Sequence, residues 1–225
     1  SRAIVMNGDL ITTVDVQDML SHHVKSDSLV SISLWPVEDP TRFGVADFDQ
    51  KKGLIRRFQE KPSLEEAYSN LINAGCYIIE TSVIQGLSTE FHSMERDVFP
   101  GIAESGRMGG YRYSGRFIDA GTPASYLEAM VAALEDNSFN IGGIVGTSWY
   151  ADPKMSKKGI ENSAVGMGCK LGDGIRVNRS AILDGARIGE NVHLDNCLIG
   201  RGSIVPANSR LVDMVIGFNQ QYQRK

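Results

Sequence analysis

Residues 160–217 carry a repeat with a period of 17, and this feature restricts the fold more than any other in the sequence. The repeat unit is a set of three aliphatic residues spaced six positions apart. This set recurs twice more at intervals of 17 residues, and one further aliphatic residue follows the last set. These positions are Val165, Leu171, Val177, Ile182, Ile188, Leu194, Ile199, Val205, Leu211 and Ile216. Small residues keep the same register in the column Cys169, Ala186 and Ser203.

A period of this length indicates a triangular coil with one short strand on each side and one inward aliphatic residue per strand. Successive coils stack at the strand spacing of about 4.8 Å. The sequence therefore predicts a short left-handed parallel β-helix of hexapeptide repeats. An ordinary antiparallel β-domain is the alternative, but it does not predict a fixed 17-residue period.

The first part of the chain has a different pattern, in which strands alternate with helices. Strands are expected over 3–6, 29–34 and 73–80 and around Val45 and Ile55, and helices over 15–23 and 123–135. This order predicts an α/β fold, with a Rossmann-like, largely parallel mixed sheet. Glycine, proline, serine and lysine are frequent over 138–159, which favours a connector. The expected organisation is an α/β domain at 1–137, a linker at 138–159, a β-helix at 160–217 and a tail at 218–225.

Composition excludes several classes of protein. A net charge of -4 and a pI near 5.6 are unlike those of a nucleic-acid-binding surface. No apolar run approaches the roughly 20 residues that cross a bilayer, and the first residues lack a secretory signal. Cys76, Cys169 and Cys197 are widely separated and form no CxxC pattern, so packed, reduced thiols are expected. We therefore expect a cytoplasmic protein that binds neither nucleic acid nor membrane.

Two aspartates and one lysine follow predicted strands and are the candidates for chemistry. Asp9 closes an Asn-Gly-Asp triplet after the first strand, and Asp119 ends a strand before a Gly-Thr-Pro helix start. If they converge, the two carboxylates suit Mg²⁺, which takes one or two carboxylates plus phosphate oxygens. The alternatives are a plain turn for Asp9 and a structural group near a helix N-terminus for Asp119. Lys61 precedes Pro62, which predicts an extended backbone at a strand end; it is a candidate phosphate ligand or a solvated surface charge.

Six segments in order resemble one family, the sugar-1-phosphate nucleotidyltransferases. The segments are Val5-Met-Asn-Gly-Asp-Leu-Ile-Thr, Asp39-Pro-Thr-Arg-Phe-Gly-Val, Phe58-Gln-Glu-Lys-Pro, Leu71-Ile-Asn-Ala-Gly-Cys-Tyr, Ser93-Met-Glu-Arg-Asp-Val-Phe-Pro and Phe117-Ile-Asp-Ala-Gly-Thr-Pro-Ala-Ser-Tyr. Together with the hexapeptide β-helix, they look most similar to mannose-1-phosphate guanylyltransferases. Heptose-1-phosphate guanylyltransferases are nearly as similar, and glucose-1-phosphate enzymes are a further alternative.

The resemblance implies a reaction and a role for each matched residue. A sugar-1-phosphate oxygen attacks the α-phosphorus of a nucleoside triphosphate and releases pyrophosphate. The implied roles are metal binding by Asp9 and Asp119, phosphate binding by Lys61, and contacts with sugar hydroxyls by Glu60, Asn73 and the backbone at Gly44 and Gly75. Glu95 and Arg96 are expected to be supporting or structural residues.

The sequence departs from the family in three places. A glycine-rich Gly-x-Gly-Thr-Arg loop, which cradles the triphosphate in the family, does not occur in these 225 residues, so we expect the chain to be inactive alone. Phe43 stands where the family often has Tyr. Phe117 and Ala120 replace a common Trp and Ile, which bears on the sugar rather than on the metal.

Two other classes of function remain open. Hexapeptide β-helices also occur in acyltransferases with a histidine base, but the single histidine of the repeat, His193, shares a column with Arg176 and Arg210. A non-catalytic scaffold paralogue is the second alternative, although such a protein needs neither Lys61 nor the two aspartates. In either case we expect a homo-oligomer built through 160–217.

Overall fold

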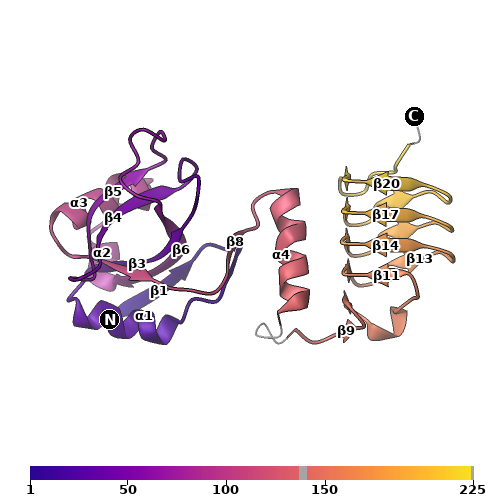
Figure 1. Cartoon of the computed structure of the whole chain (residues 1–225), viewed down its shortest axis with the longest axis horizontal. Helices are drawn as coiled ribbons and strands as arrows, with labels where there is room; N and C mark the ends of the chain where they lie inside the picture. Colours follow the sequence, from indigo (N-terminus) through magenta and orange to yellow (C-terminus); the bar gives the residue numbers. More distant parts are fainter. Residues whose placement is uncertain (137–140, 224–225) are drawn as a thin grey trace. The chain divides into compact units, whose positions relative to one another are not determined.

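The computed structural model describes residues 1–136 and 141–223. The chain divides into two compact units, Ser1–Phe117 and Ile118–Lys225 (Figure 1). Each unit is treated by itself below. The domain boundaries expected from the sequence stay a prediction.

The first unit is built on one six-stranded sheet in the order β1-β6-β3-β7-β5-β4. Its strands are β1 (Arg2–Met6), β3 (Val30–Pro36), β4 (Gly44–Asp49), β5 (Leu54–Glu60), β6 (Leu71–Glu80) and β7 (Met108–Arg112). A further pairing of β4 with β6 closes β6-β3-β7-β5-β4 into a ring. Only β3 and β7 run parallel among these six strands; every other pair is antiparallel.

The prediction of a largely parallel sheet is therefore wrong, while the mixed α/β class is confirmed. The physical reason lies in the short connections. Residues 50–53 alone join β4 to β5, and a parallel crossover needs a dozen or more residues. Gly53, with φ +70°, ends this turn. Both strands around Gly53 form as the sequence predicts, but as a hairpin.

Helices pack on both faces of the sheet. They are α1 (Val16–Lys25), α2 (Thr81–Gln85), the π-helical turn η1 (Met94–Val98) and α3 (Phe99–Glu104). The Asp15 carboxylate caps α1, as the predicted helix start requires. Successive residues of β6 point to opposite faces: Cys76 packs with Met19 of α1, whereas Tyr77 packs with Phe99 of α3. The core of this unit is thus split between two layers.

A short two-stranded sheet joins β2 (Leu10–Thr12) to β8 (Phe117–Asp119). After it comes α4 (Pro123–Glu135), which the sequence predicts with the same bounds. Thr122 and Ser125 form a capping box at its start, each side chain accepting from the backbone N–H of the other.

The second unit ends in the predicted parallel β-helix, which is confirmed (Figure 1). Its sheets follow the orders β11-β14-β17-β20, β13-β16-β19 and β21-β18-β15-β12-β10-β9. The strands are β9 (Ile144–Val145), β10 (Ser148–Tyr150), β11 (Ile160–Glu161), β12 (Ala164–Val165), β13 (Lys170–Leu171), β14 (Arg176–Asn178), β15 (Ala181–Ile182), β16 (Arg187–Ile188), β17 (His193–Asp195), β18 (Leu198–Ile199), β19 (Ile204–Val205), β20 (Arg210–Val212) and β21 (Val215–Ile216).

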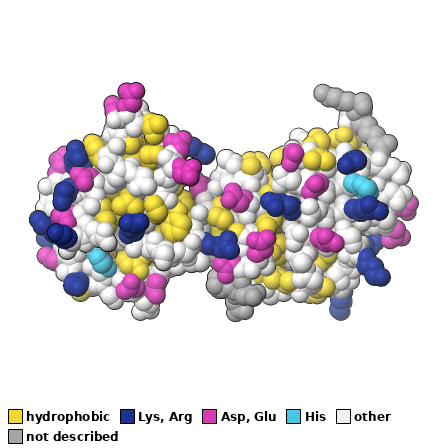
Figure 2. Space-filling view, viewed as in Figure 1, with side chains coloured by type: hydrophobic (Ala, Val, Ile, Leu, Met, Phe, Trp, Pro, Cys, Tyr) yellow, Lys and Arg dark blue, Asp and Glu magenta, His cyan; other side chains and the backbone are white. Residues whose placement is uncertain are grey.

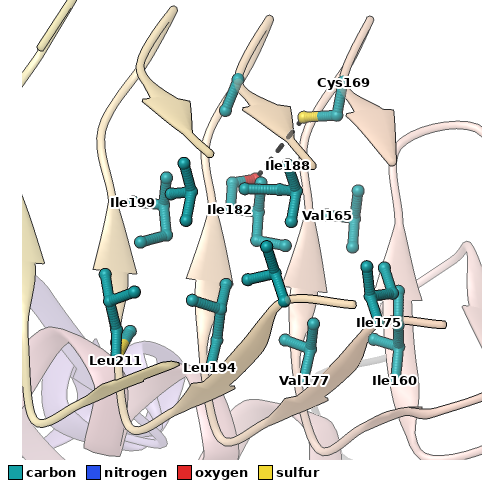
Figure 3. Packing of buried hydrophobic residues seen from close by; sticks show 14 of the residues in the cluster. Ile160, Val165, Cys169, Ile175, Val177, Ile182, Ile188, Leu194, Ile199 and Leu211 are labelled. Atoms are coloured by element: carbon teal, nitrogen blue, oxygen red, sulfur yellow. Dashed lines mark hydrogen bonds between the residues drawn. The ribbon is translucent and has the colours of Figure 1, made fainter. Parts of the chain in front are cut away.

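Strand register reproduces the 17-residue period of the sequence. Val165 pairs with Ile182, Ile182 with Ile199, and Ile199 with Ile216. Of the predicted inward positions, all are buried except Leu171, which packs partly buried against the same cluster. Figure 3 shows several of these side chains in the interior of the coils, among them Val165, Ile182 and Ile199 on one side and Val177, Leu194 and Leu211 on another.

At one corner of the β-helix, a column of serine side chains accepts hydrogen bonds from backbone N–H groups of the next coil. Ser163 Oγ accepts the N–H of Ser180 at 3.0 Å, and Ser180 Oγ accepts the N–H of Cys197 at 2.9 Å. Each oxygen serves the residue 17 positions later. Buried backbone donors at this corner are therefore paired from coil to coil.

The stretch expected to be a connector contains regular structure among its described residues. Both β9 and β10 lie within it, β10 pairs with β12, and a 3₁₀ turn spans Pro153–Met155. Tyr150 is buried in the β-helix core, and this aromatic burial explains why a glycine-rich segment is ordered. The expected tail also engages the β-helix in its described part, since the Tyr222 N–H donates to Ile204 O at 2.9 Å.

The three cysteines are free and buried, as predicted. Burial raises the pKa of each thiol. No helix among the described residues has both the length and the apolar character that crossing a membrane demands.

Candidate functional site

Asn7 and Gly75 bring the loop after β1 against strand β6. The Asn7 N–H donates to Gly75 O at 2.9 Å. Gly75 has φ +66°, and a Cβ added there would lie 2.8 Å from Asn7 Nδ2. Glycine is thus needed for both the backbone conformation and the close approach of the Asn7 side chain. Asp9, two residues on, is exposed, and no described residue donates a hydrogen bond to its carboxylate or pairs with it.

Antiparallel pairing of β4 and β5 sets Gly44 opposite Glu60. A Cβ added at Gly44 would meet the ring of Phe58 and lie 3.0 Å from Glu60 Oε2. The absence of a side chain at Gly44 therefore leaves room for the Glu60 carboxylate, which is largely covered, with 17% of its side chain exposed.

Lys61 directly follows this strand and has an unusual backbone. Its N–H donates to Phe43 O at 3.0 Å, and its φ is +48°. The extended geometry expected before Pro62 is therefore wrong, because the bond to Phe43 turns the chain into the left-handed region. A lysine in that region is strained. Its ammonium lies 3.6 Å from Glu60 Oε1, and its side chain is 57% exposed.

Tyr77 is the centre of the polar cluster in this unit. Its hydroxyl accepts a hydrogen bond of 3.0 Å from Asn73 Nδ2, while Asn73 Oδ1 accepts the Gly75 N–H at 3.0 Å. Burial raises the pKa of Tyr77 to about 12. Hydrogen bonds with Asn73 and Asn7 lower this pKa, and the negative charges of Glu95 and Glu60 raise it.

Asn73 thus links the buried Tyr77 hydroxyl to the Gly75 N–H, and the negative charges of Glu60 and Glu95 act on this hydroxyl. Glu95 lies in η1, where Ser93 Oγ donates to its carboxylate at 3.2 Å. Sequence reasoning missed Tyr77. Simple alternation along a strand would have placed residues 73 and 77 on one face, but the left-handed Gly75 and the register shift between them could not be predicted from the sequence.

Asp119 lies in the second unit, at the end of β8. One of its oxygens accepts the Gly121 N–H at 3.0 Å. Asp9 belongs to the first unit, so their meeting at one metal ion stays a prediction. As donors, the two side chains fit Mg²⁺: they are carboxylates, and each keeps oxygen atoms without a partner among the described residues. Those residues hold no group of three or more His, Cys, Asp or Glu side chains that could bind a metal ion by themselves.

An acidic side chain and a lysine at the end of β5, with amides from β6 and from the loop after β1, suit a ligand with several hydroxyls and one phosphate. Carboxylate and amide oxygens accept hydrogen bonds from hydroxyls, and the lysine ammonium attracts phosphate as a point charge.

Comparison with known proteins agrees with both units. The family model described as nucleotidyl transferase matches residues 1–136, and the model described as GlmU-like, C-terminal hexapeptide matches residues 139–225. Mannose-1-phosphate guanylyltransferase catalytic subunit beta of Danio rerio is 33% identical over 131 residues, which is 58% of this chain and 36% of that protein. Mannose-1-phosphate guanyltransferase beta-A of Xenopus laevis is 31% identical over the same shares.

A relative in Oryza sativa subsp. japonica, probable mannose-1-phosphate guanylyltransferase 3, is 27% identical over 189 residues. That match covers 80% of this chain and 52% of the relative. The chain therefore spans between about a third and about half of the length of these curated relatives.

Proposed function

The chain belongs to the nucleotidyl transferase family, and we propose on that premise that it carries the sugar-phosphate side of a site that forms a nucleotide sugar. The substrates are a sugar-1-phosphate and a nucleoside triphosphate, and pyrophosphate is the second product. We favour mannose-1-phosphate and GTP because the matched relatives bear those names. The observation that carries the proposal is the hydrogen-bonded arrangement of Asn73 with Tyr77 and Gly75, together with the pair of Lys61 and Glu60 at the end of β5.

Each residue has a distinct part in holding the sugar-1-phosphate. Lys61 binds the phosphate, and Glu60 and Asn73 accept hydrogen bonds from sugar hydroxyls. The Gly75 N–H is already used by Asn73 and its carbonyl by Asn7. Gly75 therefore acts mainly by orienting these two side chains, and its carbonyl has one lone pair left for the sugar. Gly44 leaves space beside Glu60 for the sugar ring.

The reaction is a displacement at phosphorus. A phosphate oxygen of the sugar-1-phosphate forms a bond to the α-phosphorus, and the bond from that phosphorus to pyrophosphate breaks. Because the attacking oxygen is already an anion, no general base is needed, and rate enhancement comes from positioning and charge neutralisation. Asp9 and Asp119 would hold Mg²⁺, which would supply positive charge to the phosphates.

Binding of the sugar-1-phosphate to this chain tests the proposal directly. Calorimetric titration with mannose-1-phosphate is expected to show one site, and Lys61→Ala is expected to weaken binding by about tenfold or more. Lys52→Ala is the matched control, because Lys52 is an exposed lysine in the β4–β5 turn. Parallel titrations with glucose-1-phosphate and a heptose-1-phosphate compare the affinities and show which sugar the chain prefers.

Failure to bind any of these sugar phosphates, or equal losses in the two lysine variants, contradicts the proposal and favours the scaffold alternative. The metal role has its own readout. Replacing Asp9 or Asp119 by Asn is expected to weaken Mg²⁺ binding by the chain, measured by calorimetry, while sugar-phosphate binding persists.

A further inference from the structure

We propose that the outer face of the sheet β11-β14-β17-β20 binds the diphosphate or triphosphate group of a small molecule. A groove of about 400 Å³ lies over this face. It belongs to the β-helix in the second unit, and the proposal does not rest on the sugar-phosphate site of the first unit.

Three basic side chains form a row along the groove. Strand register places Arg176 beside His193 and His193 beside Arg210, on successive coils. The next residue of each strand is buried in the core, so alternation turns this row outward. In Figure 2 a histidine side chain lies between Lys or Arg side chains over this part of the β-helix. At about 4.8 Å per coil, the row is about 10 Å long.

The row lacks internal counter-charges. Neither Arg176 nor Arg210 forms an ion pair with an acidic residue in the described part of the chain, whereas Arg201 of the same unit pairs with Asp184 at 3.3 Å. Arg176 and Arg210 lie two coils apart, one on each side of His193, so an anion lying along the row would be attracted by both guanidinium groups.

The length of the row selects the kind of anion. A single phosphate reaches two neighbouring coils at most, whereas a chain of two or three phosphates can contact all three. Arg offers paired N–H donors that match phosphate oxygens. This geometry points to a pyrophosphate-type group.

A second column, two residues further along each strand, lines the other side of the groove. Asn178 Nδ2 donates to Asp195 Oδ1 at 3.1 Å, and Glu161 lies one coil before Asn178. These acceptors suit hydroxyls or amines attached to the phosphates, such as those of a nucleoside. Glu161 and Asp195 carry negative charge in this column, which favours a short phosphate group confined to the arginine row over a long polyanion that would also cross the acidic column, such as nucleic acid.

Titration calorimetry with pyrophosphate and with GDP tests the proposal. The titrations use the chain that carries Lys61→Ala, so that phosphate binding by the first unit contributes little to the measured heat. We expect one site per chain, shifted imidazole resonances of His193 by NMR, and affinity about tenfold lower in Arg176→Ala and in Arg210→Ala. Arg187→Ala is the matched control, since Arg187 is an exposed arginine on a different sheet of the same β-helix; its affinity is expected to be unchanged.

Several outcomes would overturn the proposal. Absence of binding would do so, as would an equal loss in Arg187→Ala, which indicates general charge attraction. Inorganic phosphate binding as tightly as pyrophosphate would remove the diphosphate assignment. Gel filtration tests whether this face is instead an interface between copies of the chain. If Arg176→Ala dissociates an oligomer without changing ligand affinity, the face is such an interface and the proposal is overturned. Arg176→Lys and Arg210→Lys replace any alanine variant that fails to fold, and are expected to weaken binding in the same direction.

Discussion

The side-chain amide of Asn73 donates a hydrogen bond of 3.0 Å to the buried hydroxyl of Tyr77. Because the other end of the same amide accepts the Gly75 N–H, both ends of Asn73 are held within one strand. An amide held in this way loses little further freedom when it meets a ligand, which favours binding. Under the proposed function, we therefore expect Tyr77 to be a positioning residue that acts on the bound sugar-1-phosphate through Asn73.

Tyr77→Phe removes the acceptor but keeps the ring. We expect a several-fold loss of affinity for mannose-1-phosphate, measured by calorimetry, and a loss of about 1 kcal/mol in the free energy of unfolding. Tyr113→Phe is the control, because Tyr113 is also buried and its hydroxyl lies 2.8 Å from Thr12 Oγ1. It should lower stability by a similar amount and leave affinity unchanged; equal affinity losses would contradict a positioning role for Tyr77.

Gly75→Ala is expected to destabilise the first unit. The new Cβ would occupy a left-handed backbone position 2.8 Å from Asn7 Nδ2. We expect the free energy of unfolding in urea to fall by about 1–3 kcal/mol. Gly101→Ala provides the contrast: nothing lies within 4 Å of its added Cβ, and the residue is in α3. That change should raise stability by about 0.5–1 kcal/mol. If Gly75→Ala is as stable as the parent chain, neither the left-handed backbone nor the close approach of Leu10 and Asn7 requires glycine.

Ser180→Ala is expected to weaken the β-helix. The Cys197 N–H, buried and bonded to Ser180 Oγ at 2.9 Å, would lose its acceptor. An unsatisfied buried donor costs about 1–3 kcal/mol, measurable by thermal or urea unfolding. Cys197→Ser puts a hydroxyl in the same column and should be tolerated, because Ser163 and Ser180 already occupy it. The coil-to-coil role of this column is refuted if Ser180→Ala is as stable as the parent chain.

His23 links the stability of the first unit to pH. It is buried, with Nδ1 2.8 Å from Ser31 Oγ and Nε2 3.4 Å from Glu80 Oε1. Burial lowers the pKa of His23 below its ordinary value of 6.5, and the hydrogen bond with Glu80 opposes this only in part. The unfolded chain therefore takes up the proton first, so the stability contribution is present above pH 6.5 and is lost as pH falls from 6.5 toward the folded pKa.

Urea unfolding at several pH values on both sides of 6.5 measures this effect. We expect the parent chain to lose stability on acidification and His23→Asn to lose less. His92→Asn is the control at an exposed histidine and should keep the parent's dependence. Identical slopes for the parent and His23→Asn would show that His23 is not the group responsible.

Prediction from sequence succeeded where the determinant is local or periodic. Asp15 and Pro123 mark the starts of α1 and α4 because capping and proline act within one turn. It failed where partners are distant in the chain. Alternation of strands and helices does not specify which strands pair, so the antiparallel ring was not predicted from the sequence. Tyr150 orders a glycine-rich stretch through burial against later coils, and Lys61 takes its conformation from the carbonyl of Phe43. Neither contact is encoded in neighbouring residues.

By itself the sequence determined the β-helix, because each coil repeats the same inward positions and needs only its neighbours to bury them. It also determined the family, through six short segments in order. Tertiary structure alone decided that Asn7 meets Gly75 and Tyr77 of β6, and that no acidic residue among those described forms an ion pair with Arg176 or Arg210. These relationships depend on how strands far apart in the chain are brought together, and hydrogen bonds and charges act only across the few ångströms that folding closes.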